Sequence, residues 1–271
     1  MNAINLLNEG FSGKLTQAGT DCDGNEVSGL DMSIQFVLEN IDRTVDDEWF
    51  SLYYEDEESL QSIGNALYDG NCSTLNVYTT DITEESGEDT PVQGIAVPSD
   101  ACAFLPTVLR IWEFTFIDYS LIPRSQCDDP GKVDTLIHEV GHWIGLYHPF
   151  EGGCSGTDFV EDTPQQTVVN TVCPIGSDTC PDQEGLDSIH NYMSYTGECC
   201  TYTFTEGQKL RSHSFLSIFR SLGLVNASNT TKTLDIDEEE IAPTCIETFK
   251  LKVQNFQCFI ERLKVIFWIP L

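Results

Sequence analysis

The sequence predicts a fold of the α/β (α+β) class that ends in a loop-rich part. Three observations predict it. Several short stretches have the spacing or composition of strands. They alternate with stretches in which apolar residues recur at helical spacing. Residues 149–204 have neither spacing and are dense in Gly, Pro, Asp and Cys. The chain of 271 residues is long enough to bury a real core.

The expected strands lie in the first half of the chain. Within residues 31–38, four apolar residues alternate with mostly polar neighbours, which is the period of a half-buried strand: Met32, Ile34, Phe36 and Leu38. Residues 74–79 and 92–97 are expected to form short strands. Residues 104–121 are rich in aromatic and branched side chains, so a further buried strand is expected there.

Three helices are expected. The first covers residues 57–68, where Leu60, Ile63 and Leu67 have helical spacing and Gly70 follows at the stop. The second follows Asp129-Pro130-Gly131 and turns an apolar stripe toward a core: Val133, Leu136, Ile137, Val140 and Ile144. The third begins at a capping box and continues as an amphipathic helix. Its residues are Thr205 and Gln208, then Leu210, Phe215, Ile218, Phe219 and Leu222.

The globular part is expected to end near Leu224. The irregular segment before it is long, and four cysteines within it can staple it: Cys154, Cys173, Cys180 and Cys200. Residues 225–271 contain an acidic block and then a basic, aromatic stretch. We expect a disordered or loosely packed tail there, with docking of an amphipathic segment as the weaker alternative.

Charge and cysteine content exclude several classes. The chain carries 44 Asp and Glu against 13 Lys and Arg, and its charge of -31 repels nucleic acids. No apolar run approaches the roughly 18 residues of a membrane span. The 11 cysteines lack zinc-ribbon spacing, so disulfides and an oxidising compartment are expected, with one cysteine left over. Sequons at Asn71, Asn226 and Asn229 agree with a secreted glycoprotein, whereas the N-terminus lacks signal-peptide regions.

Three of the five histidines cluster at His138, His142 and His148. A helix places the first two on one face, and Gly145 permits a turn that brings in the third. Three imidazoles suit one zinc ion and leave its fourth position open for water, as in a catalytic site. Glu139, about 100° round the helix, can take a proton from such a water. A merely structural cluster is the alternative.

At this point the sequence resembles a known family. Residues 138–148 match the HExxHxxGxxH pattern of the metzincin zinc endopeptidases, and Asn191-Tyr192-Met193-Ser194-Tyr195 resembles their Met-turn. Further stretches are similar to the pappalysin family, especially its fungal-type secreted extracellular metalloproteases: Leu146–Cys154, Asp162-Thr163-Pro164, Cys173-Pro174, Asp178–Pro181 and His190–Met193. The resemblance is tightest over residues 132–215.

The resemblance implies a secreted zinc metalloendopeptidase with a metzincin-like zincin fold. A twisted mixed sheet with a backing helix and the zinc helix would form the upper part. A loop-rich C-terminal subdomain, stapled by disulfides, would form the lower part together with the last helix. Peptide or protein substrates would lie between the two parts, paired with an edge strand at residues 93–98.

The resemblance also implies roles for single residues. Met193 would lie beneath the imidazoles, and the Tyr195 hydroxyl would stabilise an oxyanion. Family spacing suggests the disulfides Cys154–Cys180 and Cys173–Cys200. Members bind Ca2+ near this loop, for which three carboxylates are available: Asp158, Glu161 and Asp162.

Three features that family members have, and that this sequence lacks, lead to a hypothesis about the chain. Family members begin with a signal peptide, usually a propeptide, and an additional strand, so we expect residues 1–224 to be an N-terminally incomplete catalytic domain of a secreted protein. Two other functions stay open. One is an inactive zinc-binding secreted interaction module. The other is a zinc hydrolase of another type, such as an amidase, against which the third histidine and the Met-turn argue.

Overall fold

The computed structural model describes residues 2–14, 26–83, 92–96, 114–122, 133–169, 173–197, 200–220 and 245–254. Its strands are β1 (Gln35–Val45), β2 (Ser51–Tyr53), β3 (Thr74–Thr83), β4 (Gly94–Ile95), β5 (Phe114–Asp118) and β6 (Cys245–Gln254). Its helices are α1 (Asn2–Phe11), α2 (Asp47–Phe50), α3 (Glu57–Leu67), α5 (Val133–Trp143) and α6 (Glu206–Phe219), with short 3-10 turns at Tyr119–Leu121 and Gly153–Ser155.

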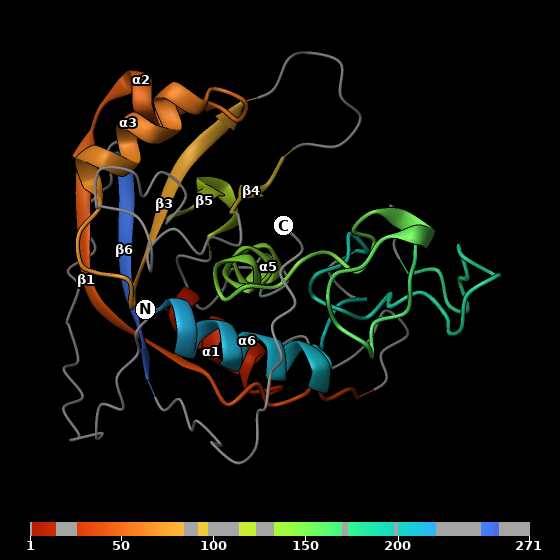
Figure 1. Ribbon diagram of the computed structural model, residues 1–271. Coiled ribbons are helices and arrows are strands. Elements are labelled where there is room, and N and C mark those ends of the chain that lie inside the picture. The colour runs from red at the N-terminus through yellow and green to blue at the C-terminus, as the bar shows by residue number, and fades with distance from the viewer. Residues whose placement is uncertain are drawn as a thin grey trace, which may run out of the picture.

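These strands form one mixed sheet in the order β1-β6-β3-β5-β4, and β2 pairs with β3 beside this path (Figure 1). β3 runs parallel to β2 and β5 and antiparallel to β6. β4 pairs antiparallel with β5 and ends the order of the described strands. The expected α/β class with a mixed sheet is therefore confirmed.

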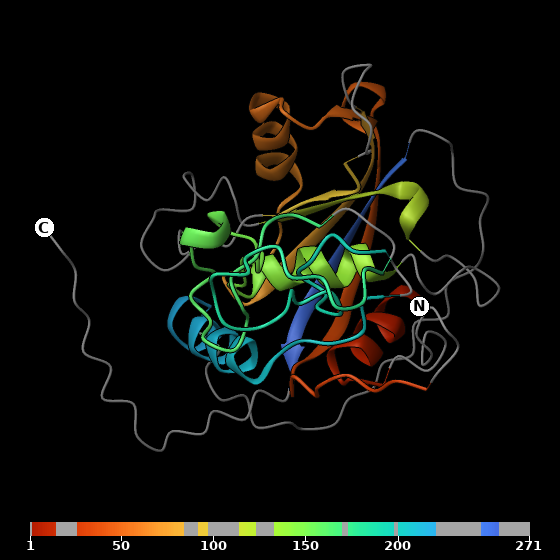
Figure 2. The ribbon, with the colours of Figure 1, turned by 90° about the vertical axis from the view of Figure 1, so that its right-hand side faces the viewer.

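Helices cover both faces of the sheet, and the alternation along β3 shows which residues face which helix. Leu75 and Val77 are fully buried in a core that they share with α1 and α5. Tyr78 and Ile82 point to the opposite face and pack with Phe116 and residues of α3. Figures 1 and 2 show α1 and α5 on one side and α3 on the other. Strand geometry produces this division because successive side chains leave a strand on opposite faces.

The expected helices at residues 57–68 and after Gly131 are confirmed as α3 and α5. The strand at residues 74–79 is confirmed and runs on to Thr83. The strand placed at 31–38 was partly wrong. Met32 and Ile34 are buried, but β1 begins only at Gln35 and continues to Val45. Of the stretches 92–97 and 104–121, the described residues form only β4, β5 and a 3-10 turn.

The predicted capping box is confirmed at the start of α6, where Thr205 and Gln208 bond reciprocally. The predicted apolar face of this helix was wrong. Leu210 is 68% exposed, whereas the buried residues are Gln208, Ser212 and Leu216. The helix turns a partly polar face inward because Gln208 hydrogen-bonds to the buried Asn191.

The N-terminal segment forms α1, a helix that the sequence analysis did not predict. Ala3, Leu7 and Phe11 of this helix are buried against β1 and α5. Among the described residues, none of the helices combines the length and apolar content needed to cross a membrane.

The tail expected at residues 225–271 needs a correction over part of its length. Residues 245–254 form β6, which lies between β1 and β3 and is hydrogen-bonded to both. The physical reason is visible in the sequence: Phe249, Leu251 and Val253 alternate with polar residues, and this is the period of a strand. The rest of that tail lies outside the described residues.

Residues 149–204 are irregular in the described parts, as expected, with one 3-10 turn. Two disulfides cross this segment, Cys154–Cys180 and Cys173–Cys200, and they are the pairs that the resemblance implied. Because the segment has few regular elements, these bonds and local side-chain hydrogen bonds hold its path. Asp187, for example, accepts hydrogen bonds from Ser177 and Thr179.

Candidate metal and active site

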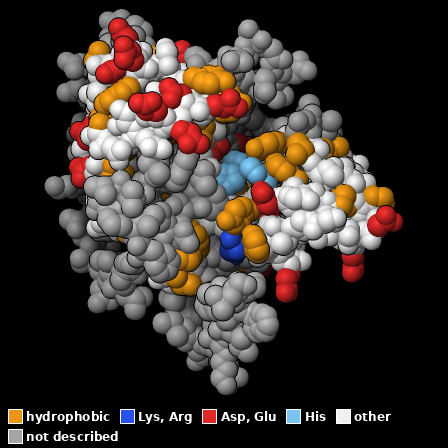
Figure 3. Space-filling view, turned by 45° about the horizontal axis from the view of Figure 1, so that its top comes forward, with side chains coloured by type: hydrophobic (Ala, Val, Ile, Leu, Met, Phe, Trp, Pro, Cys, Tyr) orange, Lys and Arg blue, Asp and Glu red, His pale blue; other side chains and the backbone are white. Residues whose placement is uncertain are grey.

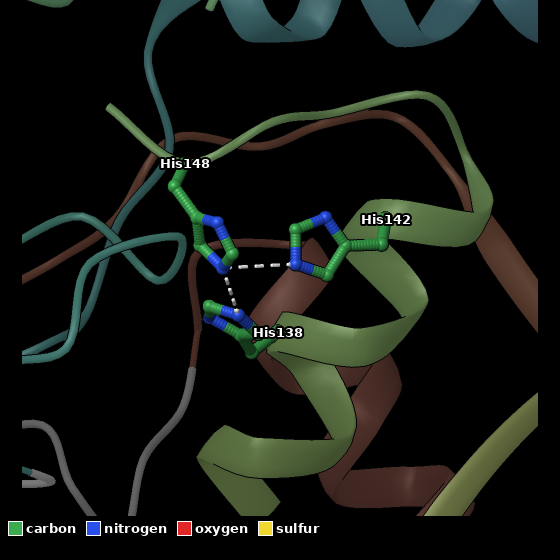
Figure 4. Close-up of side chains that lie close together, drawn as sticks. All are labelled: His138, His142 and His148. Atoms are coloured by element: carbon green, nitrogen blue, oxygen red, sulfur yellow. Dashed lines mark hydrogen bonds between the residues drawn. The ribbon is translucent and has the colours of Figure 1, made fainter. Parts of the chain in front are cut away.

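Helix α5 and the turn after it bring three imidazoles together (Figure 4). His138 and His142 lie one turn apart on α5. The helix ends at Trp143, and Gly145 has a φ of 95°, which a glycine adopts without strain. The chain then returns so that the Nε2 atom of His148 lies 3.1 Å from the Nε2 atoms of both other histidines.

The remaining ring nitrogens of the helical pair have backbone partners. The Nδ1 atom of His138 lies 2.7 Å from the carbonyl oxygen of Tyr192, and that of His142 lies 2.8 Å from the carbonyl oxygen of Leu146. A neutral imidazole that donates from Nδ1 to a carbonyl presents its Nε2 lone pair to a metal. The Met-turn and the loop after α5 therefore orient both rings.

The histidines fit a zinc ion. Burial lowers the pKa of His138 to about 4 and that of His148 to about 3, and it lowers the pKa of His142 well below its ordinary value. Neutral rings are the form that binds metal. Nitrogen atoms bound tetrahedrally to one zinc at 2.0 to 2.1 Å lie about 3.3 Å apart. The observed 3.1 Å is close to that spacing.

The Met-turn packs directly under α5. Met193 is fully buried. A Cβ atom at Gly141, which lies between the two helical histidines, would be only 2.4 Å from its Sδ atom. Asn191 accepts a hydrogen bond from the Met193 N–H and exchanges two more with the Gln208 amide. The turn is thus joined to the start of α6, a connection that the capping box alone did not indicate.

Glu139 is buried beside the histidines under strand β4. The backbone N–H of Ala96 donates a hydrogen bond to its carboxylate, and Gly94 lies directly against its side chain. Burial raises the pKa of Glu139 to about 8, and the bond from Ala96 opposes this shift. The sequence analysis placed Gly94 and Ala96 in the expected edge strand for substrate, but it did not show that they contact Glu139.

Tyr195 lies beside the imidazoles of His138 and His148. Its ring centroid is 4.9 Å from that of His148 and 4.8 Å from that of Phe150, and Phe150 stacks on His148. Burial raises the pKa of the Tyr195 hydroxyl, and the charges of Glu139 and Glu151 raise it further. The side chain is 50% exposed. Figure 3 shows histidine side chains at the surface in a hollow bordered by hydrophobic side chains.

The three carboxylates expected near Ca2+ do not converge. The buried Asp158 accepts hydrogen bonds from Thr163 and from the Val160 N–H. Asp162 instead caps α6, where it accepts from the Thr205 hydroxyl and the Gly207 N–H. Glu161 is exposed. In the described part of the chain, two side-chain groups have convergent metal-ligand atoms. One is His138, His142 and His148, and the other is Cys173, His190 and Cys200, whose cysteines form a disulfide.

Comparisons with known proteins agree with this geometry. A family profile described as Pregnancy-associated plasma protein-A, a peptidase family, matches residues 61–217, more than half of the chain. An extracellular metalloprotease of Sordaria macrospora is 36% identical over 208 residues, which cover 73% of this chain and 67% of that protein. One of Verticillium alfalfae is 39% identical over 190 residues, 69% of this chain and 63% of that protein.

The chain does not span the full length of these relatives. It is 38% identical over 190 residues to an extracellular metalloprotease of Pyricularia oryzae, and the match covers 69% of this chain and 62% of that protein. It therefore spans less than two thirds of this relative.

Solved structures show the same fold. Mirolysin in complex with a compound has a TM-score of 0.55 at 23% identity, covering 81% of this chain and 85% of that one. Mature mirolysin of Tannerella forsythia in complex with a cleaved peptide has a TM-score of 0.54 at 24% identity, with the same coverage. The profile match and the fungal relatives confirm the resemblance that the motifs carried. The chain belongs to the pappalysin family of peptidases, that of pregnancy-associated plasma protein-A.

Proposed function

We propose that this protein is a zinc-dependent endopeptidase that hydrolyses peptide bonds in peptides or proteins. The observation that carries the proposal is the convergence of three neutral imidazole Nε2 atoms beside a buried carboxyl group. His138, His142 and His148 would hold one zinc ion, and Glu139 follows the first of them directly. Membership of a peptidase family and similarity to fungal extracellular metalloproteases support the same activity.

The zinc ion and the side chains around the imidazoles would have separate roles in hydrolysis. A bound zinc ion supplies Lewis acidity toward the peptide carbonyl and lowers the pKa of water. Glu139 takes a proton from the attacking water and delivers it to the leaving amine. The Tyr195 hydroxyl, beside the imidazoles, donates a hydrogen bond to the oxyanion as it develops. Met193 supports the ligands from below through its contact with α5.

The edge strand β4 is the proposed binding surface for an extended substrate. β4 pairs with β5 on one side and ends the order of the described strands. A peptide chain can add to such an edge through backbone hydrogen bonds. We also propose secretion, because the relatives are named extracellular and because disulfides form and persist in oxidising compartments.

Substitution of Glu139 by Gln tests the mechanism. The amide cannot act as a base, so cleavage of a peptide library should fall by at least about 100-fold while one zinc per chain is retained. Glu161→Gln is the matched control, because this carboxylate is exposed and lies outside the convergent group of metal-ligand atoms. Retained cleavage in the Glu139 variant would overturn the mechanism. A wild-type chain that binds zinc but cleaves no peptide would favour the inactive interaction module.

A further inference from the structure

Strand β4 is attached to helix α5 at two points. The side-chain carbonyl of Gln93, the residue before β4, accepts a hydrogen bond of 2.9 Å from the Thr135 hydroxyl. The N–H of Ala96, the residue after β4, donates to the Glu139 carboxylate. Thr135 and Glu139 are four residues apart on α5, so they lie on one face of the helix. One helix face thus holds both ends of the strand.

Between these two points, Gly94 determines how closely the strand approaches Glu139. A Cβ atom at Gly94 would lie 2.6 Å from Glu139 Cγ, 2.8 Å from Oε1 and 2.9 Å from Cδ. Distances below 3.0 Å force a shift. The atoms in the way belong to the Glu139 side chain and not to rigid backbone, so the carboxylate would move first. A side chain at position 94 would therefore displace the base and not unfold the sheet.

The other side of β4 is fixed by the sheet. Gly94 and Ile95 pair with Ile117 and Phe116, and the Asp118 N–H donates to the Gln93 carbonyl at 2.9 Å. The strand therefore has little freedom to slide along α5. A peptide paired with its outer edge would inherit this placement relative to Glu139.

We propose that Gln93, Gly94 and Thr135 are positioning residues that hold the edge strand β4 and the Glu139 carboxylate in one fixed relation. A peptide paired with β4 would then lie at a fixed position relative to this base. This inference rests on the proposed endopeptidase function. It assigns to Gly94 the space for the carboxylate and to the Gln93–Thr135 hydrogen bond the alignment of the strand. None of the three residues takes part in proton transfer, because each acts through Glu139 or through the placement of the strand.

Gly94→Ala tests the first assignment by separating kcat from KM. A misplacement of about 1 Å at a reacting group can cost about 100-fold in rate, so kcat should fall by about that factor. KM should change by less than about threefold, because the outer edge that binds the peptide is unaltered. Zinc content and Tm should stay at wild-type values. A wild-type kcat in this variant, or loss of zinc, would overturn the assignment.

Thr135→Val tests the second assignment with a readout that does not need activity. The substitution removes the hydroxyl and keeps the shape, whereas Thr135→Ser restores the hydroxyl. In metal-free protein, amide hydrogen exchange of residues 92–96 should be about tenfold faster in the Val variant than in wild type and should recover in the Ser variant. Ser217→Ala, which removes an exposed hydroxyl on α6, should exchange like wild type.

The two readouts keep failure of the inference apart from failure of the proposed function. If wild type cleaves peptides, but the Val variant matches it in both exchange and kcat, the inference is wrong. If wild type cleaves nothing, the endopeptidase proposal is wrong, and exchange alone decides the attachment of the strand. Faster exchange in the Val variant then supports the attachment, and equal exchange overturns it.

Discussion

Gly141 lies where α5 meets the Met-turn, and its replacement by Ala measures how closely α5 and Met193 pack. A Cβ atom at this position would lie 2.4 Å from Met193 Sδ and 3.2 Å from its Cε. Ordinary contacts begin at 3.4 Å, so the Met193 thioether or the helix would have to move by about 1 Å. Met193 is fully buried, so this movement has to be accommodated within the packed core.

The net effect on stability follows from two opposing terms. Ala favours a helix interior over Gly by about 1 kcal/mol. Overpacking of a buried contact costs about 1 to 3 kcal/mol, and the short distance places this case toward the upper end. The metal-free variant should therefore lose about 1 to 2 kcal/mol, which lowers Tm by about 2 to 8 °C in a domain of this size. Zinc affinity should fall by about 10-fold or more, because both flanking histidines shift with the helix.

Thermal unfolding in EDTA and zinc competition against a chelating dye provide the assay. A second variant, Gly141→Ala with Met193→Ala, creates room for the new methyl group and should recover much of the zinc affinity. Ser217→Ala is the control, because this exposed residue of α6 gains helix propensity without a new contact. If Gly141→Ala raises Tm and leaves zinc affinity unchanged, helix propensity alone governs this position and the packing argument is refuted.

Three further predictions concern other parts of the molecule. A chain that ends at residue 244 lacks β6, so β1 and β3 each lose a partner. It should lose most of its thermal stability and bind a hydrophobic dye, and a wild-type Tm would contradict this role of β6. Asp162→Ala removes two hydrogen bonds from the start of α6 and should lower Tm by about 2 to 4 °C, whereas Glu161→Ala should leave it unchanged. Metal-free protein should be most stable near pH 6.5. The assay is the Tm in EDTA between pH 4 and 9, and a Tm that rises steadily across this range would contradict the burial argument. Below pH 6.5 the histidines bind protons in the unfolded chain but not in the folded one, so stability falls as the pH falls. As the pH rises toward 8, the buried Glu139 loses its proton, and the burial of the resulting charge lowers stability.

The helices show how much of the fold local sequence patterns predict. The stripe from Val133 to Ile144 predicted α5 because an inward-facing helix repeats its apolar residues at its own period. The same argument gave the wrong inner face for α6, since a reciprocal bond to Asn191 draws the polar Gln208 inward. β6 was missed because a disordered tail was expected from its charge, although its residues alternate as a strand does.

The candidate site likewise has features that the sequence predicts and features that depend on the tertiary structure. The sequence by itself determined which residues form the metal-ligand pattern, because the spacing of His138 and His142 and the turn at Gly145 are local consequences of helix geometry. Only the tertiary structure decided how these groups are prepared for chemistry. His138 is oriented by the carbonyl of Tyr192, and Glu139 is covered by strand β4 at Gly94. Both partners come from distant parts of the chain. Such contacts depend on which segments the whole fold brings together, and no local period encodes them.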